Sequence, residues 1–253
     1  MLLQNKVIFL TGGSMGIGAE CAKAYAKEGA QLAIAALVQQ EIENIIQEIG
    51  GEHLCLPCDV SDEVLVKDAI EKAIAHFGRI DAIHNNAGIA YPSKAIHETT
   101  TEEWDKLMNV NLKSVYLTTK YGFEALKASK GTILNTSSLV AEIGQELHAA
   151  YSATKGAMNT LTKSMALDYA KYGIRVNAVA PAGVWTPMLR DWSKEQPNSA
   201  AIENYLDKIH PLGYCPSGDV VADACVFLLS EKARFITGCI LPVSGGAELG
   251  YRL

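Results

Sequence analysis

Short apolar runs and helical stretches alternate along the whole chain, and this order constrains the fold more than any other feature of the sequence. The apolar runs have strand length, and between them lie longer segments whose apolar residues have helical spacing. Strands that alternate with helices predict right-handed βαβ units and a parallel sheet covered on both faces. The predicted strands are Val7–Leu10, Leu32–Ala36, His53–Pro57, Ala82–Asn85, Thr132–Asn135, Arg175–Ala180 and Ile240–Val243, and the predicted helices are Ile17–Glu28, Gln39–Ile49, Asp62–His76, Thr101–Lys127, Ala149–Tyr172 and Gly218–Ser230.

The chain has 253 residues, which is an ordinary length for one α/β domain. We expect residues 1–253 to form a single-domain, Rossmann-type, doubly wound parallel sheet of about seven strands, with helices on both faces. Residues 182–216 contain several prolines, together with Trp185 and Trp192, and fit neither pattern. Long insertions in compact domains are often binding loops, so this segment is predicted to be a substrate loop or lid. A surface excursion without a function is the alternative.

Composition narrows the class of partner. The net charge is −6 and no Lys/Arg-rich run occurs, so neither nucleic acid nor an anionic membrane is expected to bind. No apolar stretch approaches the roughly eighteen residues of a membrane span. The N-terminus lacks the charged start and cleavage site of a signal peptide. We therefore expect a cytoplasmic protein with a small-molecule substrate.

The six cysteines do not have the spacing of a metal site. Only Cys55 and Cys58 are close, and a zinc site would need two more ligands at regular spacing. We therefore predict no metal site and interpret the cysteines as core or strand-end thiols, since free Cys packs as a small hydrophobe. Five histidines are likewise interpreted as structural: His53, His76, His84, His97 and His210.

Three glycines in the stretch TGGSMGIG, Gly12, Gly16 and Gly18, follow the first predicted strand and precede the first predicted helix. Their spacing differs from the dinucleotide fingerprint G-x-G-x-x-G. At this position free backbone N–H groups and the helix dipole would face a phosphate. An ordinary tight strand–helix turn is the competing interpretation of the loop taken alone.

Further motifs follow the glycine loop in a fixed order. They are Asp59-Val60, Asn85-Asn86-Ala87-Gly88, Asn109-Val110-Asn111, Ser137-Ser138 and Tyr151-Ser152-Ala153-Thr154-Lys155. Together with T-G-x-x-x-G-x-G, this series resembles the short-chain dehydrogenase/reductase family over nearly the whole chain. The resemblance implies an NAD(P)-dependent oxidoreductase acting on CH–OH groups.

The predicted catalytic residues are Asn111, Ser138, Tyr151 and Lys155. Tyr151 and Lys155 are four positions apart on a predicted helix and so share one face, where the ammonium is expected to lower the pKa of the phenol. Tyr151 could then exchange a proton with an alcohol or ketone. The resemblance implies that Ser138 bonds the substrate oxygen, with Ser137 the competing serine. It also implies that Lys155 holds the nicotinamide ribose and that Asn111 supports a water in a proton relay.

The choice between NAD and NADP depends on the end of the second strand. The acidic position of the family falls on Ala36 and its successor on Leu37, while Met15 occupies the other position that is basic in NADP enzymes. A 2′-phosphate would find no cation at these three positions, so NAD is favoured over NADP, although Lys or Arg from elsewhere could still reach the site. The cofactor contacts implied by the resemblance are Gly12, Ser14, Met15, Gly16, Ile17, Gly18, Ala36, Leu37, Asp59, Val60, Asn86, Ala87, Gly88, Tyr151, Lys155, Pro181, Val184 and Thr186, with Ala182 replacing a glycine usual in the family.

Several stretches narrow the substrate. Ser137–Val140, Ile143–Gln145, Val184–Pro187 and the tail Gly245–Tyr251 resemble the branch of the family that contains L-fucose dehydrogenase, also called a 17β-hydroxysteroid dehydrogenase. That branch implies oxidation of the anomeric hydroxyl of an L-fucose-like aldose to a lactone. The candidate substrate residues are Gln145, Glu146, His148, Trp185 and Trp192.

Alternatives remain open for the substrate residues and for the function. A solvated loop would also explain Glu146 and His148, and lid packing would explain both tryptophans. One rival function is a dehydrogenase or reductase of a steroid-type or cyclic secondary alcohol or ketone. Another is a catalytically silent nucleotide sensor, which the full set of catalytic residues argues against. The resemblance also implies a homotetramer, with Thr101–Lys127 and Ala149–Tyr172 at one interface and the C-terminal strand region at another.

Overall fold

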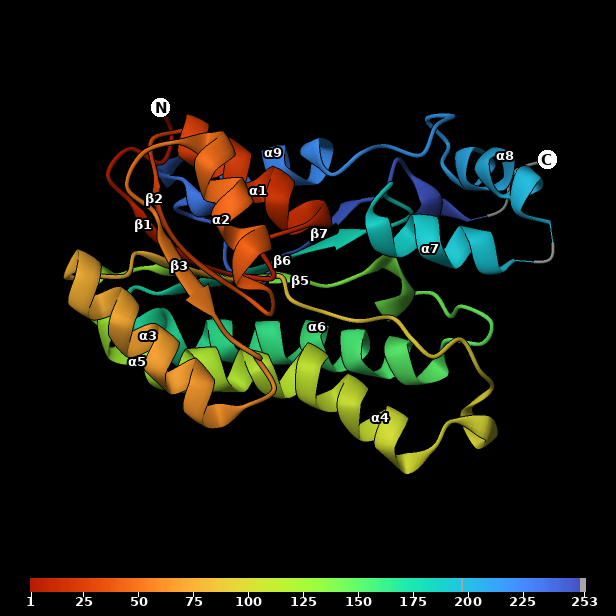
Figure 1. Ribbon diagram of the computed structural model, residues 1–253, viewed down its shortest axis with the longest axis horizontal. Coiled ribbons are helices and arrows are strands. Elements are labelled where there is room, and N and C mark those ends of the chain that lie inside the picture. Colours follow the sequence, from red (N-terminus) through yellow and green to blue (C-terminus); the bar gives the residue numbers. More distant parts are fainter. Residues whose placement is uncertain (197, 251–253) are drawn as a thin grey trace.

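Seven parallel strands form one sheet in the order β3-β2-β1-β4-β5-β6-β7 (Figure 1). The computed structural model describes residues 1–196 and 198–250, so Pro197 of the predicted lid and Tyr251 of the tail lie outside the described residues. Each observed strand overlaps the predicted one, which confirms the doubly wound parallel sheet. The strands are β1 (Val7–Thr11), β2 (Gln31–Ala36), β3 (Leu54–Pro57), β4 (Ala82–Asn85), β5 (Thr132–Thr136), β6 (Arg175–Pro181) and β7 (Ile240–Val243).

Helices cover both faces of the sheet, and each face has its own apolar core (Figure 1). The central strands β1, β4 and β5 are buried along their whole length, as expected for parallel strands between two helical layers. None of the helices in the described part of the chain is both long enough and apolar enough to span a membrane. One face is covered by α1 (Gly16–Lys27), α2 (Gln39–Ile49) and α9 (Asp219–Leu229), the other by α3 (Glu63–Phe77), α5 (Ser114–Ser129) and α6 (Ala149–Tyr169).

The order of the strands reverses at β1, which pairs with β2 on one side and with β4 on the other. In open α/β sheets, ligands bind at the carboxyl ends of the strands beside such a switch point. The carboxyl ends here are Thr11 and Asn85, and each is followed by one of the predicted motifs. The fold thus brings the glycine loop and the Asn-Asn-Ala-Gly turn together.

The predicted long helix Thr101–Lys127 is not one regular helix. It consists of α4 (Thr101–Met108), a π-helical segment at Asn109–Lys113 and α5. Thr100 begins α4 with a capping box, in which its hydroxyl accepts from Glu103 N and the Glu103 carboxylate accepts from Thr100 N. Neither apolar spacing nor the caps reveal this segment, because π-helices are rare and occur mostly as single turns inside longer α-helices.

The predicted lid contains two helices that the sequence analysis left unassigned, α7 (Pro187–Glu195) and α8 (Ser199–Ile209). Thr186 caps α7, since its hydroxyl accepts from Leu189 N at 3.2 Å, and Pro187 occupies the first turn. Proline is tolerated there because that N–H has no helical partner. The Thr186–Pro187 pair is therefore a helix-start signal that the proline content of the segment obscured.

Candidate active site

The glycine loop between β1 and α1 leaves no room for side chains. Gly12 has φ +62°, and a Cβ there would approach the Ala87 Cα to 2.8 Å. A Cβ at Gly18 would overlap the carbonyl oxygen of Gly12. The loop therefore packs tightly on the turn after β4 and presents bare backbone ahead of the α1 N-terminus. Such a surface, with unpaired N–H groups at the positive end of a helix, suits a pyrophosphate.

The hydroxyl of Thr11 connects the loop to the turn after β4. It accepts hydrogen bonds from Asn86 N at 3.0 Å and from Ala87 N at 3.1 Å. The Asn86 side chain bonds the loop in the opposite direction, since its Nδ2 donates to Thr11 O at 3.2 Å and to Gly12 O at 3.1 Å. Two predicted cofactor-binding segments are thus held in one rigid unit.

Tyr151 and Lys155 lie one turn apart on α6 and face the carboxyl end of β5. The phenol of Tyr151 faces the hydroxyl of Ser138, which follows β5. The Lys155 Nζ donates to Thr136 O at 2.6 Å and lies 5.7 Å from the centre of the Tyr151 ring. The structure therefore brings together three of the four predicted catalytic side chains.

Burial controls the titration of both groups on α6. It raises the pKa of the Tyr151 phenol, and the hydrogen bond from Ser138 opposes the rise. Burial also lowers the pKa of the Lys155 ammonium to about 8. The expectation that the ammonium would dominate and lower the pKa of Tyr151 is wrong for this state of the protein, because Lys155 is bonded to a backbone carbonyl instead of the phenol.

The two adjacent serines after β5 have different partners. Ser137 donates to Asn159 Oδ1 at 2.5 Å and is buried within the layer between β5 and α6. Ser138 instead begins a short turn, and its hydroxyl meets Tyr151. This arrangement places Ser138, and not Ser137, beside the predicted acid/base.

Asn111, the fourth predicted catalytic residue, lies in the π-helical segment and is fully buried. Its Oδ1 accepts from Ile89 N at 2.8 Å, and its Nδ2 donates to Ile89 O at 2.8 Å and to Thr154 Oγ1 at 3.1 Å. A Cβ at Gly88 would lie 3.4 Å from Asn111 Oδ1 and 3.7 Å from Lys155 Nζ. Gly88 thus keeps open the space between Asn111 and Lys155.

Glu41 is a residue near the cofactor loop that the sequence analysis missed. It lies in the first turn of α2, and its carboxylate accepts from Ser14 Oγ at 3.1 Å. Of the three uncharged positions that bear on the choice between NAD and NADP, Met15 and Leu37 are exposed and Ala36 is buried. The acidic group near the loop is therefore supplied from the next helix. The sequence shows a glutamate soon after the second strand, but it does not show that the Glu41 side chain points toward Ser14.

The remaining predicted cofactor residues lie along the same edge of the sheet. Asp59 follows β3 and accepts from both Ser61 N and Ser61 Oγ, so one of its oxygens orders the turn beside the buried Val60. Pro181 ends β6, and Val184 is buried behind it. Half-buried Ile17 lies in the first turn of α1, and Thr186 packs within 3.3 Å of the space that a Cβ on Gly16 would fill.

The predicted substrate residues divide into two groups. Gln145 and Glu146 are exposed, whereas His148 is buried, so the solvated-loop interpretation is wrong for His148. His148 Nε2 lies 3.1 Å from Ser93 Oγ, and its ring centre lies 6.4 Å from that of Tyr151. Ser93 is thus a second polar side chain near the site that the sequence analysis missed.

The two tryptophans pack within their own segment. Arg190 of α7 lies over the Trp185 ring at 5.1 Å, and Trp185 N donates to Pro216 O at 2.8 Å. The Trp192 carbonyl accepts from Gln196 Nε2 at 3.1 Å, and the Trp192 ring is half-buried. These contacts favour lid packing for Trp185, the alternative left open by the sequence.

Comparisons with known proteins agree with this architecture. Residues 12–248 match the family model described as enoyl-(acyl carrier protein) reductase. The chain is 40% identical to L-fucose dehydrogenase of Bos taurus over 247 residues, which are 98% of this chain and 91% of that protein. It is 36% identical to 2,5-dichloro-2,5-cyclohexadiene-1,4-diol dehydrogenase of Sphingobium indicum over 246 residues, which are 96% of this chain and 97% of that protein. Among solved structures, 3-ketoacyl-(acyl-carrier-protein) reductase from Brucella melitensis complexed with NADH matches with a TM-score of 0.90 and 33% identity, over 97% of this chain and 99% of that one.

Proposed function

The chain belongs to the short-chain dehydrogenase/reductase family and is an NAD(P)-dependent oxidoreductase, and from this premise we propose that it oxidises the anomeric hydroxyl of L-fucose or a similar aldose to a lactone. The observation that carries the reaction type is the grouping of Tyr151, Ser138 and Lys155 at the carboxyl edge of the sheet. The observation that favours the sugar is the 40% identity to an L-fucose dehydrogenase over 98% of the chain.

The residues at the switch point fit a nicotinamide dinucleotide. In the cradle formed by Gly12, Gly16 and Gly18, a Cβ at Gly12 or Gly18 would clash with backbone atoms, and the α1 N-terminus faces the same space. When bound there, the nicotinamide cofactor supplies the site that accepts or donates hydride. Lys155 lies at the carboxyl end of β5, where its Nζ donates to Thr136 O, and from there it can orient the nicotinamide half.

The chain's own residues move the proton. Ser138 is positioned to donate a hydrogen bond to the substrate oxygen while Tyr151 takes the hydroxyl proton as the C–H hydride departs. Because the pKa of Tyr151 is raised by burial, its neutral form dominates at pH 7, and oxidation should accelerate as the pH rises. Carbonyl reduction uses the same residues in reverse, with Tyr151 protonated, and has the opposite pH dependence.

Glu41 supports the proposal that NAD is the preferred cofactor. Its carboxylate lies next to Ser14, within the loop expected to meet the adenosine ribose. A ribose hydroxyl can donate to a carboxylate, whereas a 2′-phosphate would be repelled by it. The preference for NAD thus has two sources: Glu41 can accept a hydrogen bond from the ribose hydroxyl, and Met15 offers no positive charge to a 2′-phosphate.

Polar groups near Tyr151 support a sugar substrate. His148 and Ser93 form a hydrogen-bonded pair beside Tyr151, and sugars need several directed hydrogen bonds. Gln145 and Glu146 precede this pair on the exposed loop that leads into α6. These residues could recognise ring hydroxyls away from the anomeric centre.

A cyclic secondary alcohol is the second candidate substrate class. The 36% identity to a cyclohexadiene-diol dehydrogenase, again over nearly the whole chain, favours it specifically. A cyclic 1,4-diol and the pyranose form of an aldose both carry more than one hydroxyl group on a six-membered ring, so the same polar groups could serve either.

Turnover of a matched set of substrates tests the proposal. L-fucose, D-arabinose, D-glucose, a cyclic diol and a hydroxysteroid are each assayed with NAD and with NADP at pH 7 and pH 9, by absorbance of the reduced nicotinamide. We expect the highest kcat/KM with L-fucose or D-arabinose and NAD, and more at pH 9. If the diol or the steroid were oxidised and no aldose were, the sugar substrate would be wrong, although the reaction type would still hold.

We further propose that four copies assemble into a homotetramer, as the family resemblance implies. Phe235, which precedes β7, is fully exposed, and Leu167 on α6 is 82% exposed. Leu167 lies on one of the helices, and Phe235 beside the C-terminal strand, that the resemblance places at the two interfaces. Light scattering should give four times the 27.2 kDa mass of the chain.

A further inference from the structure

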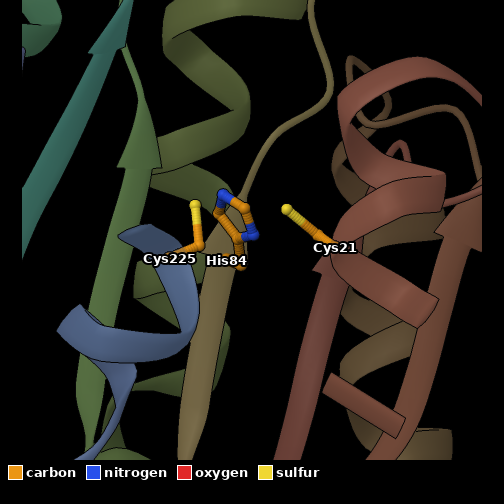
Figure 2. Close-up of side chains that lie close together, drawn as sticks. All are labelled: Cys21, His84 and Cys225. Carbon is orange, nitrogen blue, oxygen red and sulfur yellow. The ribbon is translucent and has the colours of Figure 1, made fainter. Parts of the chain in front are cut away.

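Two cysteines and a histidine that are far apart in the sequence meet inside the core. Cys21 lies on α1, His84 on β4 and Cys225 on α9, and each side chain is fully buried. Their ligand atoms all lie within 4.8 Å of one another. Figure 2 shows the two sulfur atoms converging on the imidazole, one from α1 and the other from α9. Sequence spacing could not reveal this cluster, because no two of its members are neighbours in the chain.

Hydrogen bonds fix the tautomer of His84. Asn86 donates through its Nδ2 to backbone carbonyls, so its Oδ1 is an acceptor, and Thr136 Oγ1 donates to it at 3.2 Å. The Thr136 hydroxyl therefore accepts from His84, and Nε2, at 2.9 Å, carries the proton. The lone pair of Nδ1 faces α1 and accepts a hydrogen bond from the Tyr25 hydroxyl at 2.9 Å.

This is the state in which histidine binds a metal. A ligating imidazole usually donates its other N–H to a fixed acceptor, as Nε2 does to Thr136. Tyr25, one turn after Cys21, is fully buried, and its hydroxyl must turn away from Nδ1 before a cation can bind there; its oxygen could then serve as a neutral fourth ligand. Two thiolates would neutralise a divalent cation, so the occupied site would carry little net charge into the core.

We propose that Cys21, His84 and Cys225 form a buried structural site for a thiophilic divalent cation, with Zn²⁺ the best match. Thiolate and imidazole ligands in a closed tetrahedral set are characteristic of structural zinc, and they disfavour Mg²⁺ and Ca²⁺. Zinc–ligand bonds of about 2.0–2.3 Å require ligand atoms within roughly 4 Å of each other, so occupancy needs side-chain movements of about 1 Å.

The site would join α1 and α9 to β4, beneath the cofactor loop. Cys21 follows the glycine loop directly on α1, and His84 is connected through Thr136 to Asn86. Metal occupancy should therefore stabilise the fold and tighten cofactor binding. It places no metal at Tyr151, so the proposal is independent of the substrate.

Cobalt binding to the reduced, metal-free protein tests the site, because tetrahedral thiolate-bound Co²⁺ absorbs in the near-ultraviolet and visible ranges. We expect one Co²⁺ per chain, displacement of Co²⁺ by Zn²⁺, and a rise in Tm of about 5 °C or more with excess Zn²⁺. The variants Cys21→Ala and Cys225→Ala should each lose the thiolate band and the Tm rise.

Cys58→Ala is the matched control, since Cys58 is buried on the opposite face of the sheet. It should bind cobalt as the wild type does. NADH binding by each variant shows that it is folded. Three results would each overturn the proposal. The first is wild-type protein that shows no thiolate–cobalt band, and the second is an unchanged band in both cluster variants. The third is a Cys21–Cys225 disulfide that forms in air, with no cobalt binding once it has been reduced.

Discussion

Burial opposes ionisation at both Tyr151 and Lys155, although the proposed chemistry needs their charged forms. Lys155 is 4% exposed, and its pKa is lowered from 10.5 to about 8. Because each pKa unit corresponds to 1.36 kcal/mol, keeping the ammonium buried costs up to about 3 kcal/mol of folding free energy. Active sites commonly retain such groups at the expense of stability.

Lys155→Met should therefore stabilise the fold at pH 7 while abolishing turnover. Below pH 8 both the folded and the unfolded chain carry the proton, so the whole cost is present. Between pH 8 and pH 10.5 the folded chain loses its proton first, so the cost disappears as the pH rises. After loss of the hydrogen bond to Thr136 O, the net gain should be about 2 kcal/mol at pH 7 and near zero at pH 10. Urea unfolding measures it, and a variant less stable than wild type at pH 7 would contradict the assignment.

Glu41 should decide between the two cofactors. We expect wild-type protein to bind NADH more tightly than NADPH, and Glu41→Lys to shift the ratio of the two Kd values toward NADPH by tenfold or more, about the value of one charge-assisted contact. Fluorescence of the reduced cofactors gives both Kd values without a substrate.

Glu43→Lys is the matched control for charge, since Glu43 lies on the exposed side of α2 and bonds Gln39. It should leave the ratio nearly unchanged. An equal shift in both variants would assign the effect to net charge and remove the role of Glu41.

Among the elements, β1 and β4 are coupled by one side chain at their carboxyl ends. The Thr11 hydroxyl satisfies two backbone N–H groups of the Asn-Asn-Ala-Gly turn and donates to His84 O at 3.4 Å. A buried N–H without a partner costs about 1–3 kcal/mol. The relative position of the glycine loop and the turn therefore depends on this hydroxyl.

Thr11→Val should lower the free energy of unfolding by about 2 kcal/mol and raise the Kd for NADH about tenfold. Valine keeps the shape of the side chain and removes the acceptor. Thr11→Ser keeps the hydroxyl and should behave nearly as the wild type. If valine and serine gave the same Kd and Tm, the hydroxyl would not couple the two segments.

For the whole molecule, the alternation of strands and helices was enough to predict the sheet, because burial on both faces gives the central strands β1, β4 and β5 short apolar runs. The π-helical turn at Asn109–Lys113 and the helices α7 and α8 were not predicted, since local signals there were weak or masked by prolines. The positions of Glu41 and of the Cys21–His84–Cys225 cluster were not predicted for another reason. Their partners are set by tertiary packing between elements, which a single sequence does not encode at any fixed spacing.

The central claim is that Tyr151 transfers the proton in an NAD-dependent oxidation, and paired measurements on Tyr151→Phe test it most directly. The variant keeps the ring and loses only the hydroxyl. With L-fucose and NAD, or the best substrate of the panel, kcat should fall about a thousandfold while the Kd for NADH changes less than about threefold. A variant that retained a substantial rate with the same pH dependence would contradict the account.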